Sequence, residues 1–191
     1  EDVLSHLVES PSTALAVLGT SQRAGRPGGR RLSGTAVAMA RRADRPVMLV
    51  PASATDWQGP RRVLTPLDGT GVTAMAAASA LAAIRGAETV GIPFHLGGDE
   101  GAMRRFWQGP VDEHDAWVRE ARARTLPTAT RVETRPGPVG QQVLQELRQT
   151  ACDLVVLVWS RQTRGAHGAA VLEVLTATPV PVLLVPVSGS A

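Results

Sequence analysis

An internal repeat constrains the fold of this chain more than any other feature. Residues 46–51, PVMLVP, recur as residues 181–186, PVLLVP, and an apolar run precedes each copy, LAVL at 15–18 and LVVL at 154–157. Segments that repeat along a chain fold alike, so each copy predicts a strand, a loop, a helix and a closing strand. Only the second copy has further α/β pattern in front of it. The chain therefore predicts one whole domain and the back portion of another.

Strand-like and helix-like segments alternate along residues 61–191. Such alternation predicts a parallel sheet with helices on both faces, and the unbroken apolar runs fit strands buried on both sides. We expect five strands, near 63–67, 89–94, 131–134, 154–158 and 182–187, and helices near 72–85, 111–124, 139–150 and between the last two strands. The first copy predicts a strand near 14–18, a loop over 19–31, a helix over 34–42 and a strand over 47–50. These elements divide the chain into a partial domain (1–52), a linker (53–60) and a complete domain (61–191).

The residue types exclude several kinds of enzyme. All 20 basic residues are Arg, so the chain has no phosphate-binding, Schiff-base or dyad lysine. The single Cys152 excludes an internal disulfide and a cysteine-based zinc site, and it fits a reducing cytoplasm. The four His residues are scattered, and no nucleophile-elbow pattern occurs. We therefore expect neither a catalytic site nor a metal site. No apolar run reaches the roughly 18 residues of a membrane span, so no membrane partner is expected.

Two arginine clusters can each be interpreted as a binding site or as a solvated loop. Arg161 and Arg164 follow a predicted strand and are able to hold phosphate, but a solvated loop is the favoured interpretation. The basic loop at 23–31 suggests a nucleic-acid patch, yet no aromatic residues accompany it, so no nucleic-acid partner is expected. Asp112–Asp115 is interpreted as an acidic first turn of a helix, because adjacent helical residues point in different directions.

Four segments occur in a specific order: PLDGT at 66–70, GAETV at 86–90, DLVVL at 153–157 and the closing PVLLVP run. Over residues 63–185 this order resembles the universal stress protein family, and residues 14–51 resemble the last third of a second such domain. The resemblance implies an adenine-nucleotide alpha-hydrolase-like fold with five parallel strands. It also implies that closing strands pair across an interface, so the expected partner is another copy, as a homodimer or as a pseudo-dimer of the two repeats.

Family members that bind ATP share a loop after the fourth strand, patterned G-x-x-G-x9-G-[S/T]. Glycines let backbone N–H groups approach phosphate without a Cβ in the way, and the last pair opens a helix whose N-terminus favours anions. In the first copy, Gly19 and Thr20 match the start of this loop and Gly34 and Thr35 match its end, but Gln22 replaces the second glycine.

The second copy departs further from the ATP-binding pattern. Pro66, Leu67 and Asp68 match the adenine-contacting end of the first strand, and Gly168 matches the last glycine of the loop. Val158 and Arg161, however, replace the first two glycines, and the loop is shorter. For Asp68 a turn residue that bonds its own backbone is the competing interpretation. We therefore expect this copy to bind ATP weakly or not at all.

These observations predict a cytoplasmic protein of stress response and regulation that binds ATP or another adenine nucleotide through an incomplete site. Two alternatives remain open: a structural or protein-interaction module of the same fold that binds no nucleotide, and a nucleotide-hydrolysing enzyme. The front of the first copy is missing from the sequence, so we expect that residues upstream of Glu1 complete it. We also expect that residues 1–52 do not fold alone, because so short a segment buries too little apolar surface.

Overall fold

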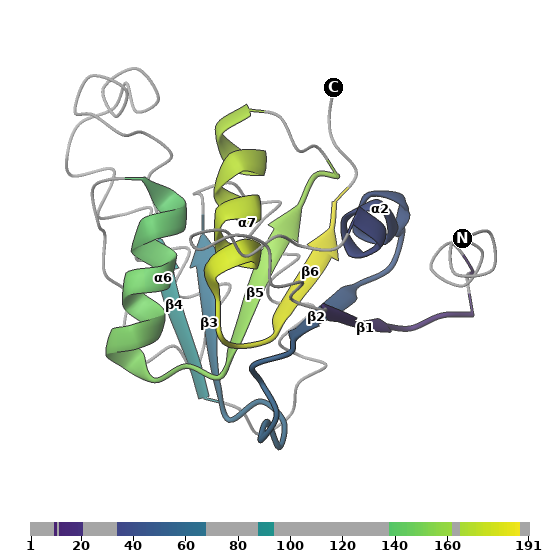
Figure 1. The fold of residues 1–191 in the computed structure, drawn as a ribbon. Coiled ribbons are helices and arrows are strands. Elements are labelled where there is room, and N and C mark those ends of the chain that lie inside the picture. Colours follow the sequence, from purple (N-terminus) through teal and green to yellow (C-terminus); the bar gives the residue numbers. More distant parts are fainter. Residues whose placement is uncertain are drawn as a thin grey trace, which may run out of the picture.

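The structure, a computed structural model, describes residues 10, 12–20, 34–67, 88–93, 138–161 and 165–187. These residues form one six-stranded sheet with the strand order β1-β2-β6-β5-β3-β4, shown in Figure 1. The strands are β1 (Ala16–Thr20), β2 (Val47–Pro51), β3 (Arg62–Leu67), β4 (Glu88–Pro93), β5 (Leu154–Trp159) and β6 (Val182–Pro186). The α/β class and the mostly parallel sheet are as predicted. The predicted strand at 131–134 lies outside the described residues.

Three helices are described: α2 (Gly34–Arg42), α6 (Val139–Thr150) and α7 (Gly165–Ala177). Their buried side chains, such as Met39, Val143 and Val174, belong to one core cluster, so all three helices cover the same face of the sheet. Helix α6 stops where Ala151 adopts the left-handed conformation, with a φ of 51°. The predicted helices at 72–85 and 111–124 lie outside the described residues.

The central strands are buried on both faces, which explains their unbroken apolar sequences. Along β5, Val155 and Leu157 join the cluster under the helices, whereas Leu154 and Val156 join a second cluster on the opposite face. This alternation is the period of two that a strand imposes on its side chains. A strand between two covered faces needs apolar residues at every position, and β5 supplies them.

Strands β2 and β6 join the two repeats in the middle of the sheet. They pair antiparallel, while the other strand pairs of the described sheet are parallel. The pairing is symmetric, because Met48 lies opposite Leu183, its own counterpart in the second repeat. The prediction that the two closing strands meet at an interface between the copies is confirmed within one chain. The complete register is Val47↔Leu184, Met48↔Leu183 and Leu49↔Val182.

The β1·β2 pair reproduces the β5·β6 pair residue by residue. Ala16 pairs with Val47, just as Val155 pairs with Val182, so Gly19 corresponds to Val158 and Thr20 to Trp159. The repeat seen in the sequence is therefore a repeat of backbone geometry.

The outer edge of β1 shows where this symmetry ends. Strand β3 pairs with the corresponding edge of β5, and there Leu154 and Val156 are 0% and 1% exposed. Within the described residues no strand pairs with the outer edge of β1. Leu15 and Val17 of the first repeat, which correspond to Leu154 and Val156, are 43% and 59% exposed.

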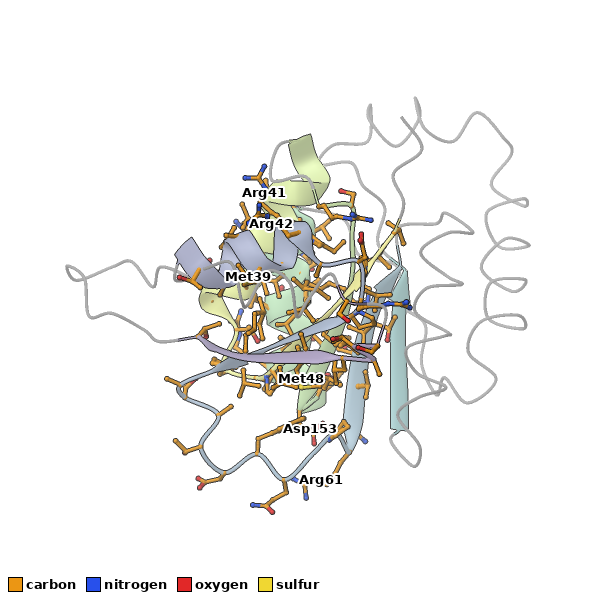
Figure 2. The ribbon with its side chains drawn as sticks, turned by 90° about the vertical axis from the view of Figure 1, so that its right-hand side faces the viewer. Met39, Arg41, Arg42, Met48, Arg61 and Asp153 are labelled. Atoms are coloured by element: carbon orange, nitrogen blue, oxygen red, sulfur yellow. The ribbon has the colours of Figure 1, made fainter. Side chains whose placement is uncertain are left out.

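The end of the predicted linker is attached to the start of β5 by one carboxylate. Asp153 accepts hydrogen bonds from the backbone N–H groups of Arg61, at 3.0 and 3.1 Å, and of Arg62, at 3.0 Å. Its own N–H donates to the Arg62 carbonyl at 2.9 Å. Figure 2 shows Asp153 and Arg61 side by side at this end of the sheet. The contact sets where β3 begins beside β5.

We expect Asp153→Ala to lower the free energy of unfolding by about 2 kcal/mol, because it leaves the Arg61 and Arg62 N–H groups without their charged acceptor. Asp153→Asn keeps one acceptor oxygen and should lose roughly half as much. Urea unfolding of the three proteins measures both values. Equal stabilities for wild type and Asp153→Ala would show that this carboxylate does not hold the strand.

Candidate functional site

The first candidate site lies at the carboxyl end of β1. Gly19 and Thr20 are the last two residues of the strand, paired with Val50 and Pro51. The predicted boundary, with the strand ending at residue 18 and the loop beginning at 19, is therefore wrong by two residues. Pairing with β2 extends the strand to Thr20. The Thr20 hydroxyl donates to the Val50 carbonyl at 3.4 Å, which attaches the strand end to its neighbour.

Helix α2 supplies the other half of this site. Gly34 and Thr35 open the helix, as predicted, and both are exposed. Helix α2 ends just before β2, and the start of β2 lies beside the start of β1, where the Ala16 N–H donates to the Pro46 carbonyl at 3.1 Å. The N-terminus of α2 therefore points toward the other end of β1, its carboxyl end. No acidic residue stands in its first turn. The structure thus brings the four first-repeat residues to one end of a strand–loop–helix unit. The loop residues 21–33 lie outside the described part.

Both glycines of the first site have open space beside them. A Cβ added to Gly19 or Gly34 would meet no atom within 4 Å. The glycines are therefore not required by close packing in the described structure. Bare backbone at such positions lets N–H groups approach a ligand.

The second candidate site is only partly described. Pro66 and Leu67 end β3, next to β5, and Asp68 lies outside the described residues. Gly168 was predicted to open the last helix. Instead α7 begins at Gly165, and Gly168 is a buried residue inside it. The prediction for the helix start is wrong because the short loop after β5 lets α7 begin almost a turn earlier.

The segment that carries the replacements for the first two glycines of the second copy contacts the first repeat through Trp159 and Arg161. Trp159 is 2% exposed, and its indole Nε1 donates to the Ala40 carbonyl of α2 at 2.9 Å. The Arg161 guanidinium pairs with the Asp44 carboxylate at 2.6 Å. Both side chains of this pair are partly exposed, and the sequence did not indicate the contact. Arg164 lies outside the described residues.

Comparison with solved structures identifies the fold. A protein of unknown function from Pseudomonas aeruginosa superposes on 97% of this chain with a TM-score of 0.68 and 15% identity. A second P. aeruginosa protein, assigned to the universal stress proteins, covers 91% of the chain with a TM-score of 0.65 and 15% identity. A universal stress protein from Archaeoglobus fulgidus covers 97% with a TM-score of 0.58 and 16% identity. The fold is that of the universal stress proteins.

The resemblance seen in the sequence is confirmed at the level of the fold. This chain spans 66%, 63% and 65% of the lengths of those three structures, just under two thirds of each. No family model matches its sequence. No curated protein matches it either.

In this universal stress fold the two candidate sites lie at opposite ends of the sheet. Because β2 and β6 run antiparallel, the carboxyl end of β1 and the carboxyl ends of β3 and β5 point in opposite directions. The first-repeat residues therefore do not combine with Pro66, Leu67 and Gly168 into one site. The contacts of Trp159 and Arg161 were missed in the sequence, since residues more than a hundred positions apart carry no local signal of pairing.

The described residues offer no sign of a covalent or metal chemistry in this fold. They contain no group of three or more His, Cys, Asp or Glu side chains placed to hold a metal ion. Cys152 is a buried core residue, as predicted, and burial raises the pKa of its thiol. The Thr150 hydroxyl lies 3.1 Å from its sulfur. Among the described helices, none has the length and apolar character needed to cross a membrane.

Proposed function

We propose that this chain is a cytoplasmic stress-response protein that binds an adenine nucleotide, ATP, through its first repeat. Gly19, Thr20, Gly34 and Thr35 would face the phosphates. One observation carries the proposal: a Cβ at Gly19 would have open space around it, whereas its counterpart in the second repeat is the buried, branched Val158.

The physical chemistry of the first site suits phosphate. The backbone N–H groups of the first turn of α2 point toward this end of the helix, where the helix dipole favours an anion. The first turn carries no acidic side chain that would repel phosphate. Thr35 adds a hydroxyl beside these N–H groups. Arg41 and Arg42 stand in the last turn, where cations complement the opposite end of the dipole.

The role proposed is binding and regulation rather than catalysis. In the described part of the chain, no group of three or more His, Cys, Asp or Glu side chains is placed to hold a metal ion. We propose that the second repeat, with Val158 in place of glycine, contributes little or no nucleotide affinity. The remaining partner is a further copy of the chain, which the exposed outer edge of β1 is suited to meet.

A second candidate function is a protein-interaction module that binds no nucleotide. The exposed apolar side chains of Leu15 and Val17 on an edge strand favour it. Edge strands with unpaired backbone groups and no protecting charge invite pairing with another chain. The two functions are separated by whether the protein binds ATP at all.

We expect calorimetric titration with ATP and Mg²⁺ to give one site per chain, and Gly19→Val to weaken binding at least tenfold. A branched side chain at Gly19 keeps the backbone N–H groups from the phosphate, and each lost charged hydrogen bond costs about 1.5–3 kcal/mol. The space beside Gly19 is open, so the variant should unfold at the same urea concentration as wild type.

Thr35→Ser and Thr35→Ala provide a matched pair of controls. Serine keeps the hydroxyl and the helix start and should retain most of the affinity, whereas alanine should lose part of it. Absence of any heat of binding at millimolar ATP would contradict the nucleotide proposal and favour the interaction module. Equal affinity in wild type and Gly19→Val would place the nucleotide elsewhere.

A further inference from the structure

The segment 158–161 follows β5 at the place where ATP-binding relatives are expected to begin their phosphate loop. In this chain it turns toward the first repeat. Trp159 reaches α2, and Arg161 reaches Asp44 just beyond the end of that helix. Both contacts join the second repeat to the first.

Trp159 satisfies a helix end that would otherwise lack a partner. The last four carbonyl groups of an α-helix have no partner inside the helix. In α2 the Ala43 N–H still bonds the Met39 carbonyl at 3.0 Å, and the Trp159 indole donates to the next carbonyl, that of Ala40, at 2.9 Å. Since Trp159 and Ala40 are both buried, water does not replace this donor. A buried carbonyl without a donor is costly, so the contact fixes the end of the helix.

Arg161 adopts a backbone conformation that suits glycine better than arginine. Its φ is 63°, in the left-handed region where glycine is at ease and other residues pay roughly 1–2 kcal/mol. In the family pattern a glycine stands at this position. With arginine there, the guanidinium reaches Asp44 at 2.6 Å, so the turn presents a cation to the carboxyl end of α2. A cation is favourable beside that end of a helix.

We propose that segment 158–161 is a docking clamp that holds α2, and with it the first repeat, against the second repeat, and that it does not serve as a ligand loop. The clamp consists of the Trp159 cap on Ala40 and the Arg161–Asp44 ion pair. This inference does not depend on nucleotide binding by the first repeat. It accounts for the absence of glycine at positions 158 and 161, because this segment makes a contact between the repeats instead of binding a ligand.

The first test is hydrogen exchange of the α2 amides in Trp159→Phe. Phenylalanine keeps most of the apolar volume but removes the donor to Ala40, so exchange at the end of α2 should accelerate about tenfold or more. Trp57→Phe is the matched control, because the Trp57 indole nitrogen has no hydrogen-bond partner in the structure. It should leave exchange in α2 unchanged. Equal exchange in α2 for wild type and Trp159→Phe would overturn the clamp.

The second test is a double-mutant cycle on Arg161→Ala and Asp44→Ala. Both side chains are partly exposed, so the coupling between them should be modest. We expect it to change the equilibrium constant of unfolding by about two- to fivefold beyond the combined effects of the two single substitutions. Arg161→Gly should be less destabilising than Arg161→Ala, because glycine fits the left-handed backbone. If the effects of the two single substitutions on the free energy of unfolding were additive, the ion pair would make no contribution to the docking clamp.

The third test restores glycines at both positions. Val158→Gly combined with Arg161→Gly is made in a Gly19→Val background, which disables the first-repeat site, and ATP with Mg²⁺ is titrated by calorimetry. We expect no binding, because Trp159 still holds the segment against α2. A new binding event in the double-glycine protein would show that the segment is a ligand loop that lacks only its glycines, and would overturn the inference.

Discussion

Leu184→Arg is expected to lower the free energy of unfolding by about 4 kcal/mol or more. Leu184 lies on β6 opposite Val47 of β2 and belongs to the core cluster that α2, α6 and α7 cover. An arginine there places a charge in the apolar seam between the repeats, where its neighbours in the cluster are hydrophobic. Because the seam lies within one chain, the loss should not depend on protein concentration. Urea unfolding at two concentrations measures it.

Val17→Arg is the matched control for this substitution. Val17 also lies on a strand of the same sheet, but it is largely exposed, so the change in the free energy of unfolding should stay within about 0.5 kcal/mol. If Leu184→Arg unfolded at the same urea concentration as wild type, the antiparallel seam would not be a packed contact. A loss of stability that disappeared at high protein concentration would place the seam between chains instead.

The sequence predicted the elements whose signals are local. The helices at 34–42 and 139–150 have the bounds that were expected, because helical spacing of apolar residues marks both ends. The repeated closing strands predicted the seam, since two similar apolar strands, each with an unpaired edge in its own repeat, tend to pair with each other. The register of the two repeats follows from the same repetition.

Other features depend on contacts that a sequence pattern does not contain. Strand β1 extends to Thr20 because β2 offers partners there, a matter of pairing rather than composition. The start of α7 at Gly165 moved Gly168 into the helix, since a shorter loop changes where the helix begins. The role of Trp159 depends on a carbonyl 119 positions away along the chain. The candidate site was therefore predicted as a set of residues, and the structure places the four of the first repeat at one end of a strand and the start of a helix.

Met39→Ala is expected to destabilise the whole chain, and not only the first repeat, by about 3 kcal/mol. Met39 lies on the inner side of α2, away from the exposed Arg41 and Arg42 (Figure 2), and is 0% exposed. It belongs to the same buried cluster as Val155 of β5. Removing three heavy atoms there leaves a cavity in a core that both repeats share. The loss should therefore appear in one cooperative transition, followed by tryptophan fluorescence in urea.

Met39→Leu separates the cavity from the change of residue type. Leucine nearly conserves the volume, so it should cost less than about 1.5 kcal/mol. Two outcomes would contradict a shared core: an early transition confined to α2 with the main transition unchanged, or equal losses for alanine and leucine. The first would mean that α2 rests on the second repeat without contributing to its stability. The predicted single transition follows because buried side chains of α2 and β2 belong to the same core cluster as those of the second repeat, so neither part unfolds without exposing the core of the other.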